Sequence, residues 1–508
     1  MNLSGALSIA SGGLANIAFQ LGVVSNNIAN ANTPDYAAEV GTQQSLTAGF
    51  EGMGVHTAAT TRSIDIALRQ AVFQQDSGIA SLTLTTTRLQ LIDSVHGTPG
   101  AGGDLAALLG KMSDAFSALL GDPAHGARQA AAVSAADTLA RGINTLSEVY
   151  TAQRQAAQSD ILGAVKDMNG ALKRIGTLSD RIVAAQAGGQ STADLENQRD
   201  AVVHGLSRVL GIRTLSQSNG DLIVTTRSGT LLPTRGEDDP VRTSDATIGS
   251  GAFHPNGGIP GITVRGTDIT ARIEDGRLGG AIGLRDKTLP RFQAELDEFS
   301  FSLSTRFEAQ GLTLFTDPNG AVPAGNGTPV QASYVGFAAI IQVNAAVTGN
   351  PASVRDGTHD IAGSATGASA FTPNPTGGPA GFSTLITRVL TFALGRETQE
   401  GVAQPGSATA GLGPAGDLTA PFSPPATLAD HATALVAAQA AENGDVTERL
   451  STEQAVQKNL SEKLSAIAGV DMDAEMARMI QLQTAYAANA RIISTVRSLF
   501  TELMQAVR

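Results

Sequence analysis

The chain lacks cysteine and tryptophan altogether, and its 508 residues include only four tyrosines. The absence of thiols excludes disulfide bonds, thiolate metal sites and a cysteine nucleophile. Charged residues make up 16% of the chain and the net charge is −12, which argues against a nucleic-acid partner because phosphate binding requires a basic surface. The seven histidines are too widely spaced to form a local ligand pair, so we expect neither a metal nor another cofactor.

The first 34 residues contain no charged side chain. Apolar residues nevertheless recur there at alternating spacings of three and four, as in the seam of a coiled coil. These positions are Leu3, Leu7, Ala10, Leu14, Ile17, Leu21, Val24, Ile28 and Ala31. Several glycines weaken the helix further, each by roughly 1 kcal/mol relative to alanine. The pattern predicts a helix that forms only when it packs against a partner.

The C-terminal segment shows the same spacing of apolar residues. Its stripe comprises Met472, Met476, Met479, Tyr486, Ala490, Ile493, Phe500 and Val507. Each terminal helix would be about 45–50 Å long at 1.5 Å per residue. We therefore expect the two terminal helices to pair with each other.

The N-terminus does not have the pattern of a secretory signal. Such a signal needs a basic segment before a continuous apolar core, whereas the first charged residue here is Asp35. The apolar residues are periodic, and no run approaches the ~18–20 consecutive apolar residues of a membrane span. We expect no cleaved signal peptide and no membrane partner.

The hydrophobic period changes along the chain from helical to alternating and back. The predicted fold class is α+β multidomain, with terminal coiled-coil helices, an α-helical bundle domain built from both ends of the chain, and an inserted β-rich outer domain. The expected divisions are a terminal helix over 1–40, the first part of the helical domain over 41–210, a β-rich part over 211–282, a returning helix over 283–311, a β-rich or loop insertion over 312–426, the last part of the helical domain over 427–469, and the second terminal helix over 470–508.

Three local motifs suggest chemistry but have simpler interpretations. Residues 97–104 are glycine-rich and precede a helix, but they lack the strand and spacing of a phosphate-binding loop. Residues 317–320 begin like a calcium loop, but no closing glutamate follows. Glu196, Arg199 and Asp200 lie three to four positions apart on an expected helix, which favours a structural ion-pair network. No catalytic residues are predicted, and we expect a protein that is not an enzyme.

The amino-acid sequences of the two ends are more specific than the spacing of their apolar residues. The residues concerned are Ser25, Asn26, Asn27, Asn30, Asn32, Thr33, Pro34 and Tyr36 near the N-terminus, and Arg491 and Ser494 near the C-terminus. Together they resemble the paired signatures of the axial proteins of the bacterial flagellum. Rod, hook and junction proteins share this pair, so it indicates a superfamily. Asp35 departs from the pattern, because a glycine usually stands there; glycine permits positive φ, and aspartate tolerates it better than most residues.

Two interior blocks narrow the resemblance. Residues 195–200, which include Gln198, Arg199 and Asp200, and residues 276–297 are similar to the hook-associated protein 1 family. The resemblance extends to about residue 311 and implies a junction subunit between hook and filament, located outside the cell on the flagellum. It further implies as partners other copies of the chain, the hook protein, the second junction protein (hook-associated protein 3) and an export chaperone at the C-terminal helix.

The interface that we expect to mediate assembly lies on the two terminal stripes. Its predicted residues are Leu7, Leu14, Leu21, Ile28, Met476, Met479, Tyr486 and Ile493. A hook or rod protein would share the ends but should lack the two interior blocks. An enzyme or binding module within residues 313–425 is the alternative from another class, and a pocket with convergent polar side chains would favour it.

Overall fold

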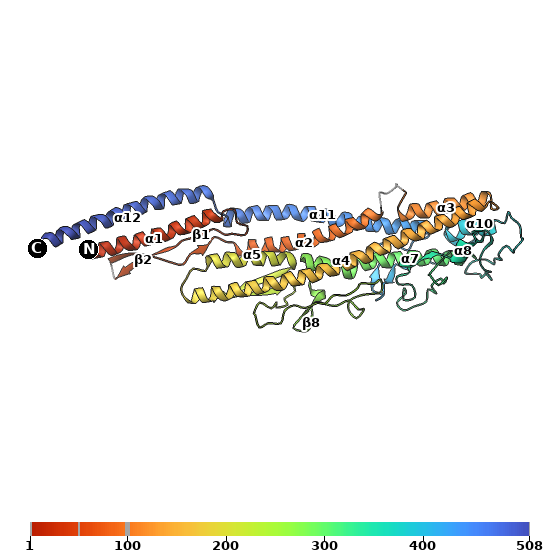
Figure 1. The fold of residues 1–508 in the computed structure, drawn as a ribbon, viewed down its shortest axis with the longest axis horizontal. Coiled ribbons are helices and arrows are strands. Elements are labelled where there is room, and N and C mark those ends of the chain that lie inside the picture. The colour runs from red at the N-terminus through yellow and green to blue at the C-terminus, as the bar shows by residue number, and fades with distance from the viewer. Residues whose placement is uncertain (1–2, 49–50, 97–101, 507–508) are drawn as a thin grey trace.

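The computed structural model describes residues 3–48, 51–96 and 102–506. The molecule is elongated, and both termini lie at one end of it (Figure 1). Two helices from opposite ends of the sequence form a narrow extension there, and the remaining helices form a longer body. Of the glycine-rich segment 97–104, residues 97–101 lie outside the described part of the chain.

Helices account for most of the described secondary structure. They are α1 (Leu3–Asn30), α2 (Ile66–His96), α3 (Leu105–Gly121), α4 (Gly126–Ala187), α5 (Ala193–Val209), α6 (Gly276–Gly283), α7 (Leu289–Glu308), α8 (Ala345–Gly349), α9 (Ser353–Asp356), α10 (Thr384–Arg388), α11 (Leu428–Ala468) and α12 (Met472–Ala506). Asp104 accepts a 2.8 Å hydrogen bond from the Ala107 amide and so caps α3. A π-helical turn over Leu284–Thr288 joins α6 to α7.

The strands are short and form separate two-stranded antiparallel sheets. They are β1 (Glu39–Val40), β2 (Gln43–Ala48), β3 (Glu51–Thr57), β4 (Thr61–Arg62), β5 (Ile212–Ser216), β6 (Leu222–Thr226), β7 (Thr263–Val264), β8 (Thr267–Asp268), β9 (Phe315–Thr316), β10 (Gln342–Val343), β11 (Glu397–Gln399), β12 (Val402–Ala403), β13 (Ala410–Leu412) and β14 (Leu418–Thr419). The pairs are β1 with β4, β2 with β3, β5 with β6, β7 with β8, β9 with β10, β11 with β12, and β13 with β14.

The segments 211–282 and 312–426 therefore contain less β-structure than the sequence led us to expect. Only β5 and β6 reach five residues in these segments, and the rest of their chain is mostly turns, irregular backbone and short helices. Frequent glycine and proline interrupt the apolar runs, so that each run pairs over two or three residues before the chain turns. The second of these segments lies at the end of the molecule opposite the termini (Figure 1).

Two hydrophobic clusters hold the body together. The larger includes Met112, Phe116, Ile143, Phe299 and Leu435, so it joins α3, α4, α7 and α11. The second is built around the later part of α4, with α5, α6 and the β5–β6 hairpin. Helices from both halves of the sequence thus share the larger core, and the body can form only when the two halves fold together.

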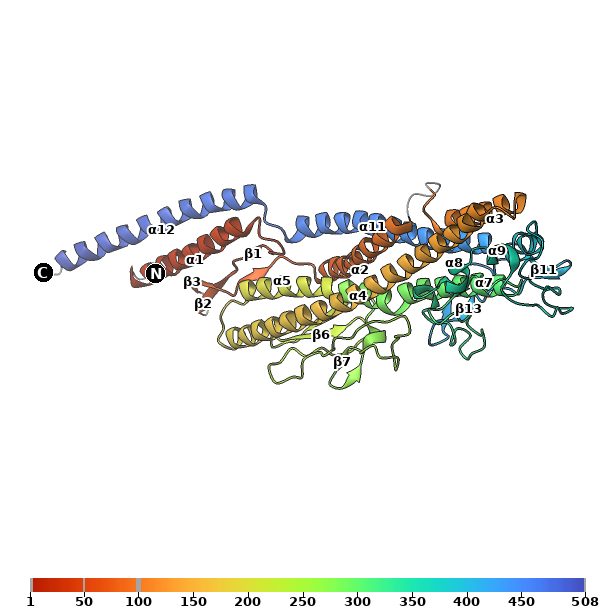
Figure 2. The same cartoon turned by 45° about the vertical axis from the view of Figure 1, so that its right-hand side comes forward.

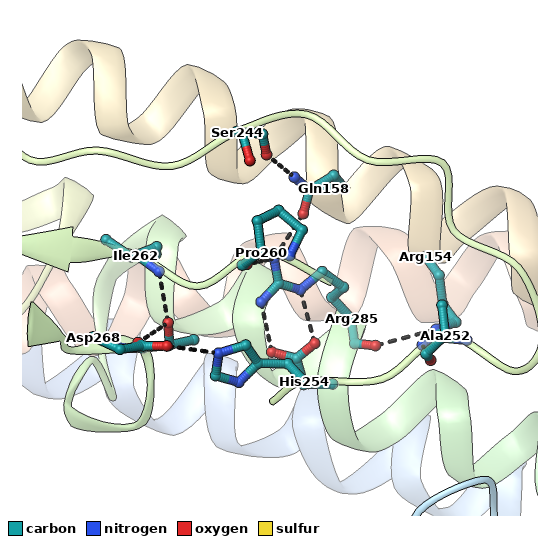
Figure 3. A network of polar contacts seen from close by, with 11 residues as sticks. Arg154, Gln158, Ser244, Ala252, His254, Pro260, Ile262, Asp268 and Arg285 are labelled. Carbon is teal, nitrogen blue, oxygen red and sulfur yellow. Dashed lines mark hydrogen bonds and ion pairs between the residues drawn. The ribbon is translucent and has the colours of Figure 1, made fainter. Parts of the chain in front are cut away.

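Two buried arginines, Arg154 and Arg285, hold residues 244–262 against α4 through hydrogen bonds, as Figure 3 shows. Arg154 donates to the carbonyl oxygens of Arg285, Gly249 and Ala252 over 2.7–3.2 Å. Arg285 makes a two-pronged contact with Asp286, at 2.8 and 2.7 Å, and donates to Gln158 Oε1 over 2.6 Å. Burial lowers the pKa of Arg154 to about 10. Because buried charges require such partners, this network gives the irregular segment a fixed position.

Candidate assembly interface

Helices α1 and α12 lie side by side in both views (Figures 1 and 2). A Cβ added at Gly13 would lie 3.5 Å from Asn489 Oδ1, so the helices approach closely there. Asn27 Nδ2 donates a 3.0 Å hydrogen bond to Glu475 Oε1 near the other end of the pair. The β2–β3 hairpin covers another face of α1, where Asn16 Nδ2 donates to Gln43 Oε1. We call α1 and α12 the terminal helix pair.

The N-terminal stripe divides into two sets within the single chain. Ala10, Ile17 and Val24 are buried, with Val24 only 1% exposed. The predicted interface residues on α1, by contrast, are half-buried: Leu7, Leu14, Leu21 and Ile28. The terminal helix pair therefore uses the stripe only in part and leaves the larger aliphatic side chains partly accessible.

The predicted residues of α12 do not share one environment. Met479 and Ile493 are half-buried, whereas Met476 is 46% and Tyr486 40% exposed. Val496 is the one buried side chain among the described residues of α12. The exposed large apolar side chains of this helix are Met472, Met476, Ile480, Tyr486, Ile492, Leu499, Leu503 and Met504. We call these residues the exposed stripe of α12.

The signature residues at the end of α1 and just after it form a compact hydrogen-bonded turn. Asn27 is fully buried, and its side chain binds the Glu39 backbone at both the amide (2.9 Å) and the carbonyl (2.8 Å). Tyr36 Oη donates to Asn27 Oδ1 over 2.9 Å. Asn30 donates to Asn26 and accepts from Thr33 Oγ1 over 3.1 Å. These amides return the chain from α1 along its own flank into β1.

The second signature block fixes this returning segment to α5. Asn197 donates to the Ala37 carbonyl over 3.1 Å. Asp200 forms an ion pair with Arg62 at 2.5 Å and a second one with Arg69. Arg62 also contacts Glu196 at 2.8 Å. We call residues 31–40, Arg62, Arg69 and this part of α5 the helix–body junction, or in short the junction.

The expected local ion-pair network of α5 needs a correction. Glu196 and Asp200 pair with Arg62 and Arg69 from other elements, and not with Arg199. Arg199 NH1 donates instead to the Gly220 carbonyl over 2.8 Å and to Ser179 Oγ over 3.3 Å. Burial lowers the pKa of Arg199. Sequence spacing indicated the right residues but could not indicate partners that come from distant segments.

Other signature residues are exposed in the single chain. Gln198 is exposed and donates to Asp194 on its own helix. Six more are also exposed: Ser25, Asn32, Thr33, Pro34, Arg491 and Ser494.

Sequence reasoning missed the part of the junction that His204 forms. His204 Nδ1 lies 2.6 Å from Asp35 Oδ1, and its Nε2 lies 2.5 Å from Asp76 Oδ2. Asp35 has a φ of 63°, which is the left-handed conformation that a glycine at this position would adopt freely. No local pattern links His204 to these carboxylates, which lie 169 and 128 positions away. The aspartate at position 35, where a glycine usually stands, was the sequence feature that could have pointed to this contact.

The expectation that no segment is long and apolar enough to span a membrane needs a correction. Among the described residues, the segment Gly5–Asn30 of α1 is long and apolar enough to cross a membrane by length and composition. Several polar residues, among them Asn16 and Asn27, interrupt its apolar residues, which is why a count of consecutive apolar residues did not find it. Both side chains make the hydrogen bonds described above within the terminal helix pair and its hairpin. In the same described ranges, no group of three or more His, Cys, Asp or Glu residues could hold a metal ion.

Three family models match separate parts of the chain. Residues 89–321 match the helical domain of flagellar hook-associated protein FlgK. Residues 7–36 match the flagella basal body rod protein family, and residues 465–506 match the C-terminal segment of the flagellar basal body rod FlgEFG proteins. The two rod-type matches thus fall on the terminal helix pair, and the match to the FlgK helical domain falls on the body.

Curated proteins of known name show the same likeness. The chain is 23% identical over 325 residues to flagellar hook-associated protein 1 of Salmonella typhimurium, which covers 61% of this chain and 56% of that protein. It is 24% identical over 342 residues to the protein of the same name from Escherichia coli, covering 63% and 59%. The chain therefore aligns with less than two thirds of the length of these relatives.

The solved structure of the flagellar hook junction protein FlgK from Burkholderia pseudomallei is also similar, with a TM-score of 0.42 and 24% identity over 49% of this chain and 46% of that one. The family models and the curated relatives confirm the resemblance that the sequence motifs indicated. This chain is similar to flagellar hook-associated protein 1.

Proposed function

We propose that the chain is a structural subunit of the bacterial flagellum that forms the junction between hook and filament. It assembles on the tip of the hook through the terminal helix pair and provides the platform on which the filament grows. The matches at both ends and in the body support this assignment, since they combine rod-type terminal helices with the helical domain of a hook-associated protein.

The exposed stripe of α12 carries the proposal. Eight large apolar side chains lie exposed on one helix that has a single buried residue in its described part. Exposed large apolar side chains in such number mark interaction sites in soluble proteins. The occupants that we propose are the terminal helices of neighbouring copies, which would cover Met476 and Tyr486 as well as the half-buried Leu7, Leu14, Leu21 and Ile28.

Folding and binding are coupled in this proposal. A helix with little charge and several glycines gains too little from its own packing to offset the entropy of ordering. Contacts with neighbouring subunits supply the missing burial, and the ends order as the subunit joins the assembly. The predicted partners are then further copies of this chain, the hook protein below and hook-associated protein 3 above.

Electron microscopy of a deletion strain tests the assignment. Cells without this chain should carry intact hooks without filaments and should release flagellin into the medium. The parent gene should restore filaments. Cells that lack hooks as well would favour the alternative, a hook or rod protein, which shares the terminal segments.

An export chaperone is the expected partner before assembly. The exposed stripe of α12 would be a liability in the cell, because exposed apolar surface promotes aggregation. We propose that a chaperone covers the C-terminal segment until export, which takes place through the channel of the flagellum. Removal of residues 470–508 should abolish chaperone binding in a pull-down, while removal of residues 1–40 should leave it intact.

A further inference from the structure

His204 occupies the place where the terminal helix pair meets the body. It lies on α5, its ring stacks on Phe73 of α2 with 4.9 Å between ring centroids, and it is 9% exposed. Its two nitrogens contact Asp35 Oδ1 at 2.6 Å and Asp76 Oδ2 at 2.5 Å. A carboxylate only accepts hydrogen bonds, so each contact requires a proton on the imidazole. The geometry therefore selects the doubly protonated, positively charged ring.

The other charged groups around His204 come from the same elements. Arg208 NH2 of α5 lies 3.4 Å from Asp76 Oδ2 and also 3.4 Å from His204 Nε2. Arg69 of α2 and Asp200 of α5 line, together with His204, a hollow of about 250 Å³. Helix α11 lines this hollow with uncharged residues, Ser461, Leu464, Ser465 and Ala468. Burial lowers the pKa of His204, but the hydrogen bonds to the two carboxylates outweigh it and raise the pKa to about 9.

The two carboxylates are not equivalent. The side chain of Asp76 is 7% exposed and has Arg208 as a second partner. The side chain of Asp35 is 30% exposed, and it belongs to the turn that follows α1. A neutral imidazole donates from one nitrogen only. The donor would stay with Asp76, because a buried carboxylate loses more when it gives up a hydrogen bond than the more exposed Asp35, which water can reach.

We propose that His204 is a proton-dependent latch that fixes the turn after α1 to the helical body. In the protonated state Asp35 and Asp76 are both bound and the latch is closed. Loss of the proton releases Asp35 and makes the position of the turn at residues 31–36 variable, while Asn197 and the Asp200–Arg62 ion pair still hold the segment that follows.

The sign of the pH dependence follows from the direction of the shift. The pKa of His204 is raised above its ordinary value of 6.5. The latch therefore contributes fully below about pH 6.5, weakens as the pH rises, and is lost as the pH passes about 9. Nuclear magnetic resonance of the imidazole should show this titration in the parent and a lower pKa in Asp35→Asn.

Spin-label distances test the latch directly, because a chain without cysteine accepts two labels cleanly. Labels at Asn32→Cys and Lys166→Cys, both exposed positions, would report on the turn and on α4. In the parent, the distance distribution should be narrow at pH 7 and broad at pH 10. In Asp35→Asn it should be broad already at pH 7, although asparagine keeps the tolerance for the left-handed backbone.

A matched control removes a different contact between histidine and aspartate. Asp268→Asn disrupts the 2.9 Å contact with His254, which lies away from the junction. It should behave like the parent at both pH values. A parent distribution that does not change between pH 7 and pH 10 would overturn the latch, as would an Asp35→Asn distribution as narrow as that of the parent at pH 7.

Discussion

Asn27 and Glu475 are 448 positions apart, yet Asn27 Nδ2 donates a 3.0 Å hydrogen bond to Glu475 Oε1. The same amide group donates to the Glu39 carbonyl, so one buried side chain connects α1 with α12 and with the strand that follows the turn. A buried polar residue between paired helices costs stability but fixes their register. Asn27 therefore specifies how the two ends of the chain align.

Replacing Asn27 by alanine should loosen the end of α1. The substitution leaves the backbone amide and carbonyl of Glu39 and the hydroxyl of Tyr36 with lost partners. A buried unsatisfied group costs about 1–3 kcal/mol, so hydrogen exchange over residues 20–40 should accelerate by about tenfold or more. Ser25→Ala, at an exposed position of the same helix, should leave exchange unchanged. Equal exchange in the two variants would contradict the role assigned to Asn27.

Two glycines of α4 should respond oppositely to alanine. A Cβ at Gly176 would lie 1.8 Å from the Thr234 carbonyl oxygen, whereas nothing lies within 4 Å of a Cβ at Gly170. Gly176→Ala should displace the segment at Thr234 and destabilise the body by about 1–3 kcal/mol. Gly170→Ala should stabilise it by roughly 0.5–1 kcal/mol through helix propensity. Urea unfolding of both variants measures the difference, and a stabilising Gly176→Ala would refute the close contact.

The buried Glu295 should make the body less stable as the pH rises. Neither of its carboxylate oxygens has a hydrogen-bond partner among the residues described, and Arg291 Nε lies 3.5 Å away. Burial, opposed in part by Arg291, raises the pKa of Glu295 from 4.5 to about 7. The folded chain therefore holds a proton that the unfolded chain releases, and stability should fall from about pH 4.5 to pH 7 and then level off.

Glu295→Gln removes this penalty. At pH 8 the free energy of unfolding should rise by on the order of 1–2 kcal/mol, because a neutral amide replaces a poorly compensated charge. The decline between pH 4.5 and pH 7 should become shallower, although the buried Asp297, whose pKa is also raised to about 7 by burial, retains its own contribution. Glu148→Gln, at an exposed position of α4, is the control. An unchanged pH profile in Glu295→Gln would show that this carboxylate is compensated in the folded chain.

Hydrophobic periodicity predicted the long helices well. The expected helical part over 41–210 contains α4, Gly126–Ala187, and the expected helical part over 427–469 is observed as α11, Leu428–Ala468. Both have many apolar residues at helical spacing over several turns, so local pattern and tertiary packing agree. The loop-rich segments 211–275 and 312–426 were harder, because their backbone is held by contacts such as those of Arg154 with carbonyl groups that no sequence pattern reveals.

The sequence predicted several residues of the junction but not the residues that they contact. The signature motifs pointed to Asn27, Tyr36 and Asp200, which do form its hydrogen bonds and ion pairs. Their partners come from other segments, and His204 had no local feature to distinguish it. Asn16 shows the same limit: it lies outside the apolar stripe, yet it is only 3% exposed and donates a hydrogen bond to Gln43 of the hairpin.

Leu14→Asp tests whether the N-terminal stripe serves assembly. Leu14 is half-buried in the single chain, so a carboxylate there can still reach water. In an assembly that covers the stripe, the same carboxylate would be buried without a partner, at a cost of several kcal/mol. Thermal unfolding of the purified variant should therefore match the parent, while cells that produce it should make hooks but few filaments and should release flagellin.

The matched control for Leu14→Asp is Ala15→Asp. Ala15 is the next residue of α1 and is exposed, unlike Asn16, whose hydrogen bond to the hairpin would be lost on substitution. Ala15→Asp adds the same charge to the same helix and should affect filament number much less. If Leu14→Asp instead lowered the melting temperature of the purified chain by many degrees, the stripe would belong to an internal core. The half-buried leucines would then stabilise the subunit itself, and the surface that joins neighbouring copies would have to be sought on the exposed stripe of α12 alone.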